Sequence, residues 1–384
     1  MKKLIAMLLA LVMVLSLAAC GSAPAETPAT PETPAAPETP AAPEAPEAPA
    51  TDAPAAEEVA AKGIYGSADE VYAFNVFLTG VEYWWPVYAS FKETAKMLGV
   101  STIYGGTPEY DATLQVESFD AMLAQKPAAI VTQPINPEPF VEPINRAVAN
   151  GTEVVCICLD APTTDRAGFV TSDNTNEGTQ AAHALAAAIG GKGSVATCVN
   201  PGQTNHDVRT NTFRAVIESE YPTIKFAGEV VANQDMDAAQ LGITTLAQQN
   251  PDLAAVFCPE ATSAQGAAAA VKALGIDCKV MCCDVNEAIL DSIKAGEFYG
   301  AINPNQGAQG YWAMMVAFSA CHPELFSFMS YREGAGLNPI NVPKLDNGLD
   351  VVTAENADSY YMGNFCAQNG HADVDDLLSA YTAE

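Results

Sequence analysis

Between residues 71 and 175 the chain alternates short apolar runs with longer amphipathic ones. Short, nearly continuous apolar runs are typical of strands buried on both faces of a sheet. They predict strands at Val71–Thr79, Val100–Tyr104, Ala128–Thr132, Glu153–Leu159 and Gly168–Ser172. The amphipathic runs between the first four predict helices at Val87–Leu98, Asp111–Gln125 and Pro137–Asn150.

The rhythm restarts after a helix expected at Asn176–Ile189. Further strands are expected at Ser194–Asn200, Ile224–Val231, Ala254–Pro259, Lys279–Asp284 and Phe298–Ile302. Their helices are expected at Asn205–Glu220, Met236–Asn250, Ser263–Leu274, Glu287–Ala295 and Ala308–Ala320. Alternation of this kind predicts parallel sheets covered on both faces. Two rounds of it predict two α/β domains of similar architecture.

The first twenty residues have the pattern of an export signal. Lys2 and Lys3 precede the apolar run Leu4–Leu17, which is short for a membrane span. The run ends in Leu-Ala-Ala-Cys-Gly, which resembles the bacterial lipoprotein signal and implies cleavage before Cys20 and lipidation of its thiol. An ordinary signal peptide with a chance cysteine is the alternative. The expected location is the outer face of the cytoplasmic membrane, with the protein held by acyl chains.

Residues 21–62 are expected to form a tether. Here the composition falls to Ala, Pro, Glu and Thr, and proline recurs at every third position from 28 to 49. Polyproline II has three residues per turn, so these rings would line one side of an extended rod. At about 3.1 Å per residue such a rod reaches on the order of 100 Å.

Charge and cysteine content narrow the functional classes. The 384 residues carry a formal net charge of -29, from 46 acidic and 17 basic residues. Such a field repels nucleic acid and anionic lipid and favours a neutral or cationic ligand. The ten cysteines include no C-x-x-C pair and no companion histidine spacing, so a zinc site is not expected. No glycine-rich phosphate-binding loop follows the first predicted strand, which argues against a dehydrogenase, and no cofactor is expected.

Polar and aromatic side chains follow the predicted strands, where the carboxyl ends of parallel strands line a ligand crevice. The first strand is followed by Tyr83, Trp84 and Trp85, of which we expect Trp85 to be core or rim. The other candidates are Asp160, Asn205, Arg209, Glu260, Asp284, Asn303 and Asn305. Carboxylates and a guanidinium hydrogen-bond adjacent hydroxyls, and rings cover the C–H face of a sugar, so this set predicts a sugar site.

Each residue also has a structural interpretation. Aromatic residues near a helix start often serve packing, aspartates at strand ends often cap the next turn or helix, and Arg209 can pair with a surface carboxylate. A catalytic interpretation would pair Asp160 with Glu260 as in glycosidases. The four histidines form no triad or metal spacing, so an enzyme is not expected.

From about Val71 to Ala320 the chain resembles the ribose/galactose-type periplasmic binding proteins, the solute receptors of ABC importers. The resemblance lies in "YWWPVYASFKETAKMLG" (Tyr83–Gly99), "VVCICLDAP" (Val154–Pro162), "VTSDNTNEGTQAA" (Val170–Ala182), "NHDVRTNTF" (Asn205–Phe213), "NPDLAAVFCPEATSAQGAAAAVKALG" (Asn250–Gly275) and "VMCCDVNEAILDSIKAGEF" (Val280–Phe298). It implies two Rossmann-like domains of the type I periplasmic binding protein fold around a hinged cleft.

The resemblance also implies roles for particular residues. Tyr83 and Trp84 would stack on the sugar, Asp160 would bond ring hydroxyls, and Arg209 and Asp284 would complete the site with Asn205 as a helper. The chain departs from the ribose receptors at Ala161, where they carry arginine, and at Glu260, where they often carry asparagine. Asn303 and Asn305 are further candidates, and the sugar is expected to be a pentose or hexose.

The expected organisation is a signal peptide at 1–20, the tether at 21–62, an N-terminal domain at 63–174 that also receives a late crossing segment, and a C-terminal domain at 175–320. Residues 321–384 are expected to cross back between the domains, with a closing helix at "DVDDLLSAY". The expected partners are the sugar, the permease subunits and, through the anchor, the membrane, with the protein a monomer that binds no nucleic acid. A sugar or autoinducer sensor that signals to a membrane partner is the alternative to transport.

Overall fold

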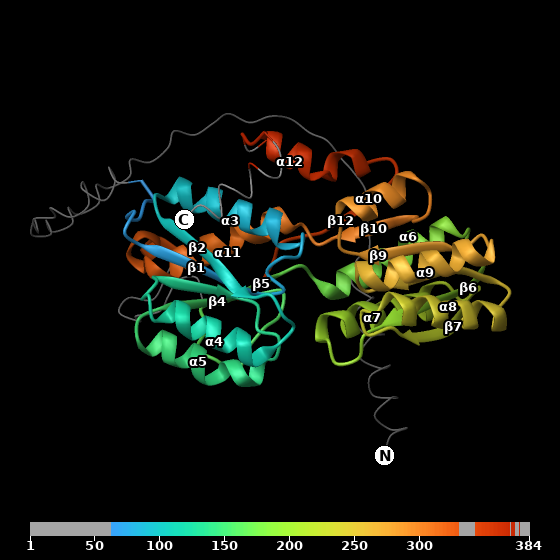
Figure 1. The fold of residues 1–384 in the computed structure, drawn as a ribbon, viewed down its shortest axis with the longest axis horizontal. Helices are drawn as coiled ribbons and strands as arrows, with labels where there is room; N and C mark the ends of the chain where they lie inside the picture. The colour runs from blue at the N-terminus through green and yellow to red at the C-terminus, as the bar shows by residue number, and fades with distance from the viewer. Residues whose placement is uncertain (1–62, 330–341, 369, 373–375, 377–384) are drawn as a thin grey trace, which may run out of the picture. The chain divides into compact units, whose positions relative to one another are not determined.

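The computed structural model describes residues 63–329, 342–368, 370–372 and 376 (Figure 1). The predicted signal peptide, Cys20 and the tether lie outside these residues, as does nearly all of the predicted closing helix. Strands and helices alternate from Val71 onward in the order expected from the apolar pattern.

The first sheet has six strands in the order β11-β5-β4-β3-β1-β2, and all of its pairings are parallel. Its strands are β1 (Val71–Phe77), β2 (Ser101–Thr107), β3 (Ala129–Thr132), β4 (Glu153–Ile157), β5 (Gly168–Thr171) and β11 (Val342–Asp346). The helices of this round are α3 (Trp84–Leu98), α4 (Ala112–Leu123) and α5 (Pro137–Ala149). Strand β11 comes from the tail, so the chain returns to this sheet late.

The second sheet repeats the arrangement as β12-β10-β9-β8-β6-β7. Its strands are β6 (Gly193–Val199), β7 (Ile224–Val231), β8 (Leu253–Cys258), β9 (Lys279–Cys283), β10 (Gly300–Asn303) and β12 (Asp350–Thr353). Its helices are α6 (Asn174–Ala188), α7 (Thr204–Glu220), α8 (Met236–Gln249), α9 (Ala261–Leu274) and α10 (Glu287–Lys294). Only β12, also from the tail, pairs antiparallel, against β10.

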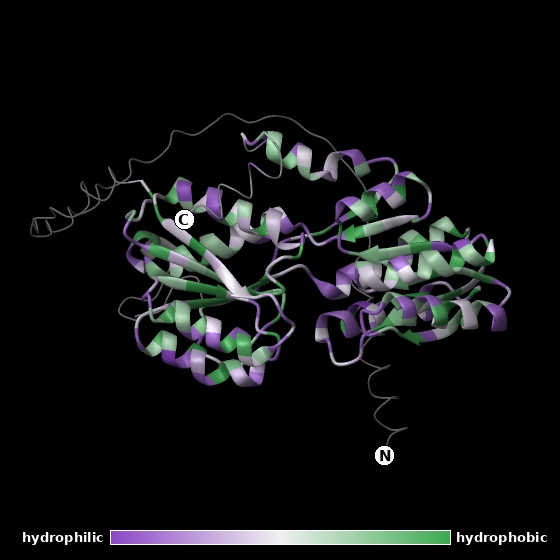
Figure 2. Cartoon of the chain, viewed as in Figure 1, coloured by the Kyte–Doolittle hydropathy of each residue, from purple (hydrophilic) through white to green (hydrophobic). Residues whose placement is uncertain are grey.

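Each sheet is buried on both faces, as its nearly continuous apolar strands require. One apolar cluster lies between the first sheet and α3, and a second lies under α4 and α5. The second sheet has one cluster beneath α8 and α9 and another beneath α6 and α7. Figure 2 shows largely apolar strands covered by helices that carry both apolar and polar residues.

Short polar side chains begin several of these helices. Asp111 accepts hydrogen bonds from the backbone N–H groups of Thr113 and Leu114, and Asp173 does the same for Thr175 and Asn176. Such caps satisfy donors that a helix leaves open in its first turn. The expectation that an aspartate after a strand can serve as a cap therefore holds for Asp173.

Helix α11 (Gln306–Cys321), predicted within the second round, packs against α3 and against strands of the first sheet. The tail continues through η1 (Pro323–Met329), β11 and β12, and then through η2 (Ala357–Tyr360) and α12 (Met362–Gln368). Along the described ranges the chain therefore passes from one sheet to the other three times, after β5, after β10 and between β11 and β12.

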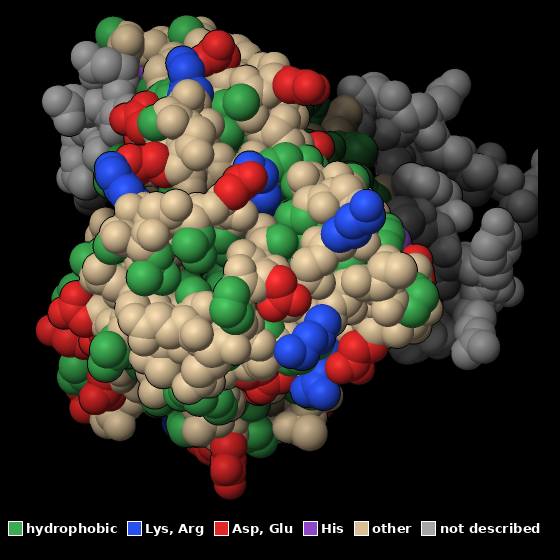
Figure 3. Space-filling view, turned by 90° about the vertical axis from the view of Figure 1, so that its right-hand side faces the viewer, with side chains coloured by type: hydrophobic (Ala, Val, Ile, Leu, Met, Phe, Trp, Pro, Cys, Tyr) green, Lys and Arg blue, Asp and Glu red, His purple; other side chains and the backbone are tan. Residues whose placement is uncertain are grey.

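No helix in the described ranges combines the length and apolarity needed to cross a bilayer. On the face shown in Figure 3, acidic, basic and apolar side chains are interspersed. The negative net charge is thus not gathered into one patch on that face.

The contact between α3 and α11 depends on Gly310. A Cβ atom at this position would overlap the backbone carbonyl oxygen of Val87, whereas a Cβ at Gly307 in the same helix would have Phe365 Cε2 as its nearest neighbour, at 3.9 Å. Gly310→Ala should lower the melting temperature by about 5 °C, because overpacking costs on the order of 1–3 kcal/mol. Scanning calorimetry measures this effect.

Gly307→Ala is the matched control. It makes the same change in the same helix, where alanine is the better helix former, so its melting temperature should be equal or slightly higher. Equal melting temperatures for the two variants would show that the two helices do not need this close approach.

Candidate functional site

A cavity of about 150 Å³ lies at the carboxyl ends of strands from both sheets. Side chains that follow β1, β3, β4, β5, β7 and β9 line it, together with groups from the start of α7 and from α11. The lining residues are Phe77, Leu78, Val81, Tyr83, Trp84, Tyr110, Gln133, Cys158, Leu159, Thr171, Ser172, Asn174, Gln203, Asn205, His206, Arg209, Gln234, Asp284 and Gln309. This is the position that open parallel sheets give to a ligand.

Four of these residues have a left-handed backbone although none is glycine. Leu78, Cys158, Gln234 and Asp284 have φ values of 50°, 56°, 58° and 74°. Each follows a strand and turns the chain abruptly at the cavity. A non-glycine residue in this region is uncommon and costs on the order of 1–3 kcal/mol, and such strain gathers at binding and catalytic sites.

Aromatic rings form one wall. The Tyr83 hydroxyl donates to Gln309 Oε1 at 3.1 Å and lies 3.4 Å from Cys158 Sγ. Trp84 packs edge-on against Tyr83 and donates its Nε1–H to the carbonyl of Phe77 at 3.1 Å. Trp84 is only 4% exposed and joins the core, whereas Trp85 is half-buried and lies outside the cavity lining, as expected for a residue at the rim. Tyr83 is therefore the ring with the freer face.

Arg209 is held rigidly at the cavity. Its Nε donates to Glu177 on α6, and its Nη1 donates to the carbonyl of Pro259 at 2.9 Å. Burial by itself lowers the pKa of Arg209, but the adjacent Glu177 carboxylate outweighs this and leaves the pKa well above its usual value. The alternative of pairing with a surface carboxylate is wrong, since Glu177 is fully buried. Among the described residues, Nη2 has no hydrogen-bond partner.

Asp284 lies close enough to Arg209 and Glu177 to be influenced by their charges. Within the described part of the chain its carboxylate has no hydrogen-bond partner. Burial raises its pKa, the Arg209 charge opposes that rise, and Glu177 and Glu260 add to it, so the pKa is about 6. The carboxylate is thus ionised at neutral pH at a cost in stability. A ligand hydroxyl that donates to it would offset that cost.

Cys158 and His206 are neutral members of the site. Burial raises the pKa of the Cys158 thiol to about 12, so it is not a nucleophile at neutral pH. Burial and the Arg209 charge lower the pKa of His206 well below its usual value. Its Nδ1 lies 3.1 Å from Asn200 Nδ2.

Two acceptors in the lining have no partner among the described residues. These are Gln133 Oε1, from a side chain 7% exposed, and Asn205 Oδ1. An acceptor buried without a partner costs about 1–3 kcal/mol, so the cavity is suited to an occupant that donates hydrogen bonds. The sequence analysis selected Asn205 but missed Gln133, although Gln133 directly follows the third predicted strand.

The cavity brings together five of the predicted site residues: Tyr83, Trp84, Asn205, Arg209 and Asp284. It also gathers residues that the sequence analysis did not select, including His206, Gln234 and Gln309. The strand-end rule identifies Gln234, which follows β7. Gln309 lies inside α11, and the packing of that helix against α3 and the strands of the first sheet brings it to the site.

Four predicted residues are placed elsewhere. Asp160 forms an ion pair with Arg166, whose Nη2 also donates to the carbonyl of Pro343 in β11 at 3.1 Å. Glu260 caps α9 by accepting from the backbone N–H of Ser263, and its Oε1 also accepts from Asn200 Nδ2 at 3.4 Å. Asn303 and Asn305 line a separate cavity.

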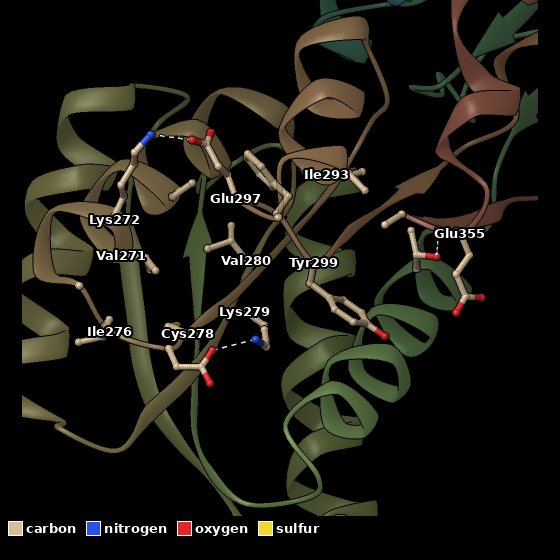
Figure 4. Close-up of a pocket in the computed structure, with 17 residues that line it drawn as sticks. Val271, Lys272, Ile276, Cys278, Lys279, Val280, Ile293, Glu297, Tyr299 and Glu355 are labelled. Atoms are coloured by element: carbon tan, nitrogen blue, oxygen red, sulfur yellow. Dashed lines mark hydrogen bonds and ion pairs between the residues drawn. The ribbon is translucent and has the colours of Figure 1, made fainter.

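A larger cavity of about 650 Å³ lies at the opposite edge of the second sheet, where β9 and β10 begin (Figure 4). Its lysines are already paired, Lys272 with Glu297 at 2.6 Å and Lys279 with Asp277 at 2.8 Å. The unpartnered acceptors Gln133 Oε1 and Asn205 Oδ1 belong to the smaller cavity, which is therefore the candidate binding site.

Removing the Asp284 charge should stabilise the unliganded protein. The pKa of Asp284 is raised from 3.8 to about 6 in the folded state, so the protonated carboxyl is favoured by folding. Its contribution to the free energy of unfolding is fully present below the unfolded pKa and is lost as pH rises through about 6. Asp284→Asn should therefore raise the melting temperature by roughly 5 °C at pH 7.5, and the gain should fade between pH 6 and pH 4. Melting curves at pH 7.5 and pH 4 measure this.

The control is Asp165→Asn, at an exposed position, which should leave the melting temperature nearly unchanged. A lower melting temperature for Asp284→Asn at pH 7.5 would mean that the carboxylate stabilises the empty site.

A sequence profile for the family described as "Periplasmic binding protein domain" matches residues 72–322. Among curated proteins, the D-apiose import binding protein of Actinobacillus succinogenes is 28% identical over 208 residues, which is 53% of this chain and 66% of that protein. The D-allose-binding periplasmic protein of Escherichia coli is 26% identical over 213 residues, 52% of this chain and 67% of that protein. The chain thus spans about two thirds of the length of these curated relatives.

Solved structures agree with this. The arabinose-binding protein AraP of Geobacillus stearothermophilus has a TM-score of 0.71 and 29% identity over 76% of this chain and 99% of its own. A sugar-binding protein of a Bacillus halodurans sugar ABC transporter has a TM-score of 0.71 and 27% identity over 76% of this chain and 100% of its own. These matches confirm the predicted architecture. The chain belongs to the periplasmic binding protein family and has its type I fold.

Proposed function

We propose that this protein is an extracytoplasmic substrate-binding lipoprotein of an ABC importer and that it binds a monosaccharide, a pentose or hexose, in the cavity at the strand ends. Relatives above 25% identity support the class, since they are named as binding proteins for arabinose, apiose and allose. A solute-binding protein of Agrobacterium radiobacter, 26% identical with a TM-score of 0.63 over 75% of this chain and 96% of its own, is in complex with D-arabinose. The proposed activity is binding, not catalysis.

The observation that carries the proposal is the set of open hydrogen-bonding groups beside an aromatic wall. Gln133 Oε1 and Asn205 Oδ1 are acceptors without a described partner. Asp284 and Arg209 also line the cavity, and the hydrogen bonds of Arg209 to the protein use Nε and Nη1, which leaves Nη2 to donate to a ligand. A monosaccharide presents adjacent hydroxyls that both donate and accept, and its C–H face packs on a ring such as Tyr83. The high pKa of Tyr83, raised mainly by burial, keeps its hydroxyl a neutral donor.

Binding would act through the crossing segments. Asn347, in the crossing between β11 and β12, is 4% exposed and donates to the backbone carbonyl of Pro304 in the crossing after β10. Two of the three crossings are thereby joined and would move as one hinge. A sugar favours the closed conformation, in which side chains from both sheets contact it. A membrane partner would recognise that closed conformation.

The proposal is tested on the mature chain with a panel of pentoses, hexoses, polyols and amino acids. A ligand at about 100 times its Kd adds about 2.7 kcal/mol, so one monosaccharide should raise the melting temperature by several degrees. Gln133→Ala and Asn205→Ala should each weaken binding of that sugar about tenfold by calorimetric titration, because each removes a buried acceptor.

Gln125→Ala is the matched control, because this exposed glutamine belongs to the same α/β half of the chain as Gln133. It should bind the sugar with unchanged Kd. A rise in melting temperature with an amino acid and with no sugar would contradict the proposed ligand class. Wild-type affinity for the sugar in both Gln133→Ala and Asn205→Ala would contradict the contacts assigned to these two residues.

The lipid anchor forms a separate part of the proposal and rests on the sequence around Cys20. Cys20→Ser should move the protein from the membrane fraction to the soluble fraction of cells, since the serine cannot take the lipid that the thiol takes. Immunoblots of the two fractions measure this, with Cys321→Ser as the control. Retention of Cys20→Ser on the membrane would favour an uncleaved signal or another anchor.

A sugar sensor is the alternative use of the same closure. An importer predicts that deleting the protein abolishes uptake of the identified sugar. A sensor predicts unchanged uptake and a lost response to the sugar.

A further inference from the structure

A second cavity, of about 210 Å³, lies beside the crossing segments and shares no lining residue with the cavity proposed above to bind the sugar. Its walls come from the start of α3, the turn before α10, the crossing after β10 and the tail segments η2 and α12. Of these elements, α3 packs on the first sheet and α10 packs on the second, so both halves of the chain contribute to the lining. The sequence analysis had placed Asn303 and Asn305 in the sugar site, and the structure places them here.

Two buried amide side chains line this cavity with one polar atom each left unsatisfied. Asn303 and Gln306 are both 7% exposed, and Asn303 Oδ1 and Gln306 Nε2 have no partner among the described residues. One atom accepts and the other donates. Each costs about 1–3 kcal/mol when left unpaired in the interior. An occupant that offers both a donor and an acceptor would satisfy the two together.

The outer wall is aromatic and is fixed on both sides. Met362 and Phe365 pack against the buried pair formed by Ala89 of α3 and Cys366. Tyr361, which also lines the cavity, donates to Asp291 of α10 at 2.6 Å. The tail therefore rests on α3 at one end and on α10 at the other, and it covers the cavity with rings.

The ionisable groups of known sign in the lining are all acidic. Glu82, Glu287 and Asp350 line the cavity, and none of the described residues in its lining is a lysine, arginine or histidine. An anion would meet three carboxylates and no counter-charge, so the lining disfavours phosphates and sugar acids.

We propose that this cavity is a second binding site, for a small hydroxylated molecule without negative charge. Such a molecule donates a hydroxyl to Asn303 Oδ1, accepts from Gln306 Nε2 and places its C–H groups on the rings of the tail. Both a neutral polyol and an amino alcohol have this chemistry. The carboxylates favour the amino alcohol, whose ammonium group they attract.

Occupancy of this site acts on the hinge. Gln306 begins α11 directly after the crossing that contains Pro304, to which Asn347 donates, so an occupant held by Gln306 stiffens the segments that would move on closure. A ligand that binds one arrangement of the two halves more tightly changes affinity in the other cavity, and the coupling is reciprocal.

The experiment uses the full mature chain with erythritol as the neutral probe, ethanolamine as the cationic probe and gluconate as the anionic probe. Binding is measured by saturation-transfer NMR and by thermal shift. Asn303→Leu and Gln306→Met keep the side-chain volume and remove the unsatisfied atoms. Each should raise the melting temperature of the unliganded protein and weaken probe binding at least tenfold. A rise in stability together with lost binding cannot come from misfolding.

Asn205→Ala, in the first cavity, is the matched control and should bind the probe as the wild type does. Binding of erythritol alone assigns a neutral polyol, and tighter binding of ethanolamine assigns the amino alcohol. The proposal is overturned if neither probe binds, if gluconate binds equally well, or if binding survives in Asn303→Leu and Gln306→Met. Loss of binding in Asn205→Ala alone would overturn it too, because the probe would then occupy the first cavity. Failure of the sugar panel leaves this test unaffected.

Discussion

Parallel strand pairing is the constraint on which the site depends. A strand buried on both faces accommodates few polar side chains along its length, and those it has, such as Asn75 and Thr132, pair with each other, so most polar groups gather where strands end. Because the pairings within β1 to β5 and within β6 to β10 are parallel, the carboxyl ends of each set meet at one edge. Leu78, Cys158, Gln234 and Asp284 mark that edge by turning the chain in a left-handed conformation. The same arrangement that buries the core thus supplies the cavity with its side chains.

The charges at that edge are interdependent. Glu177, fully buried on α6, orients the guanidinium of Arg209 and accepts from Ser172. Arg209 in turn holds down the pKa of Asp284, which burial and the neighbouring carboxylates raise. The buried acid Glu177 therefore sets the local field, although it does not line the cavity. Removing either member of this ion pair would leave the other as an uncompensated buried charge.

Much of this architecture could be predicted from the sequence. Apolar runs located ten strands and amphipathic runs located nine helices, because the spacing of apolar residues within a strand or helix is a local property of the sequence. Strands β11 and β12 were not predicted as such, since each is short and pairs only with a distant element. Within the site, the strand-end rule found Asp284 and Arg209 but also selected Asp160 and Glu260. Those two carboxylates have nearer partners, Arg166 and the start of α9. Whether a carboxylate at a strand end lines the cavity or pairs with another protein group depends on contacts between residues distant in sequence, which the sequence pattern does not show. The domain boundaries remain a prediction.

The buried thiols have a consequence for handling and for chemical durability. Burial raises the pKa values of Cys156, Cys158, Cys278 and Cys321 to about 12. Only the thiolate attacks a disulfide or an oxidant at an appreciable rate, and its fraction at neutral pH falls about tenfold for each unit by which the pKa exceeds the pH. These cysteines therefore oxidise slowly while the chain stays folded. Disulfide exchange at these four positions is therefore disfavoured in the folded chain, and unfolding is the event that would expose them to it.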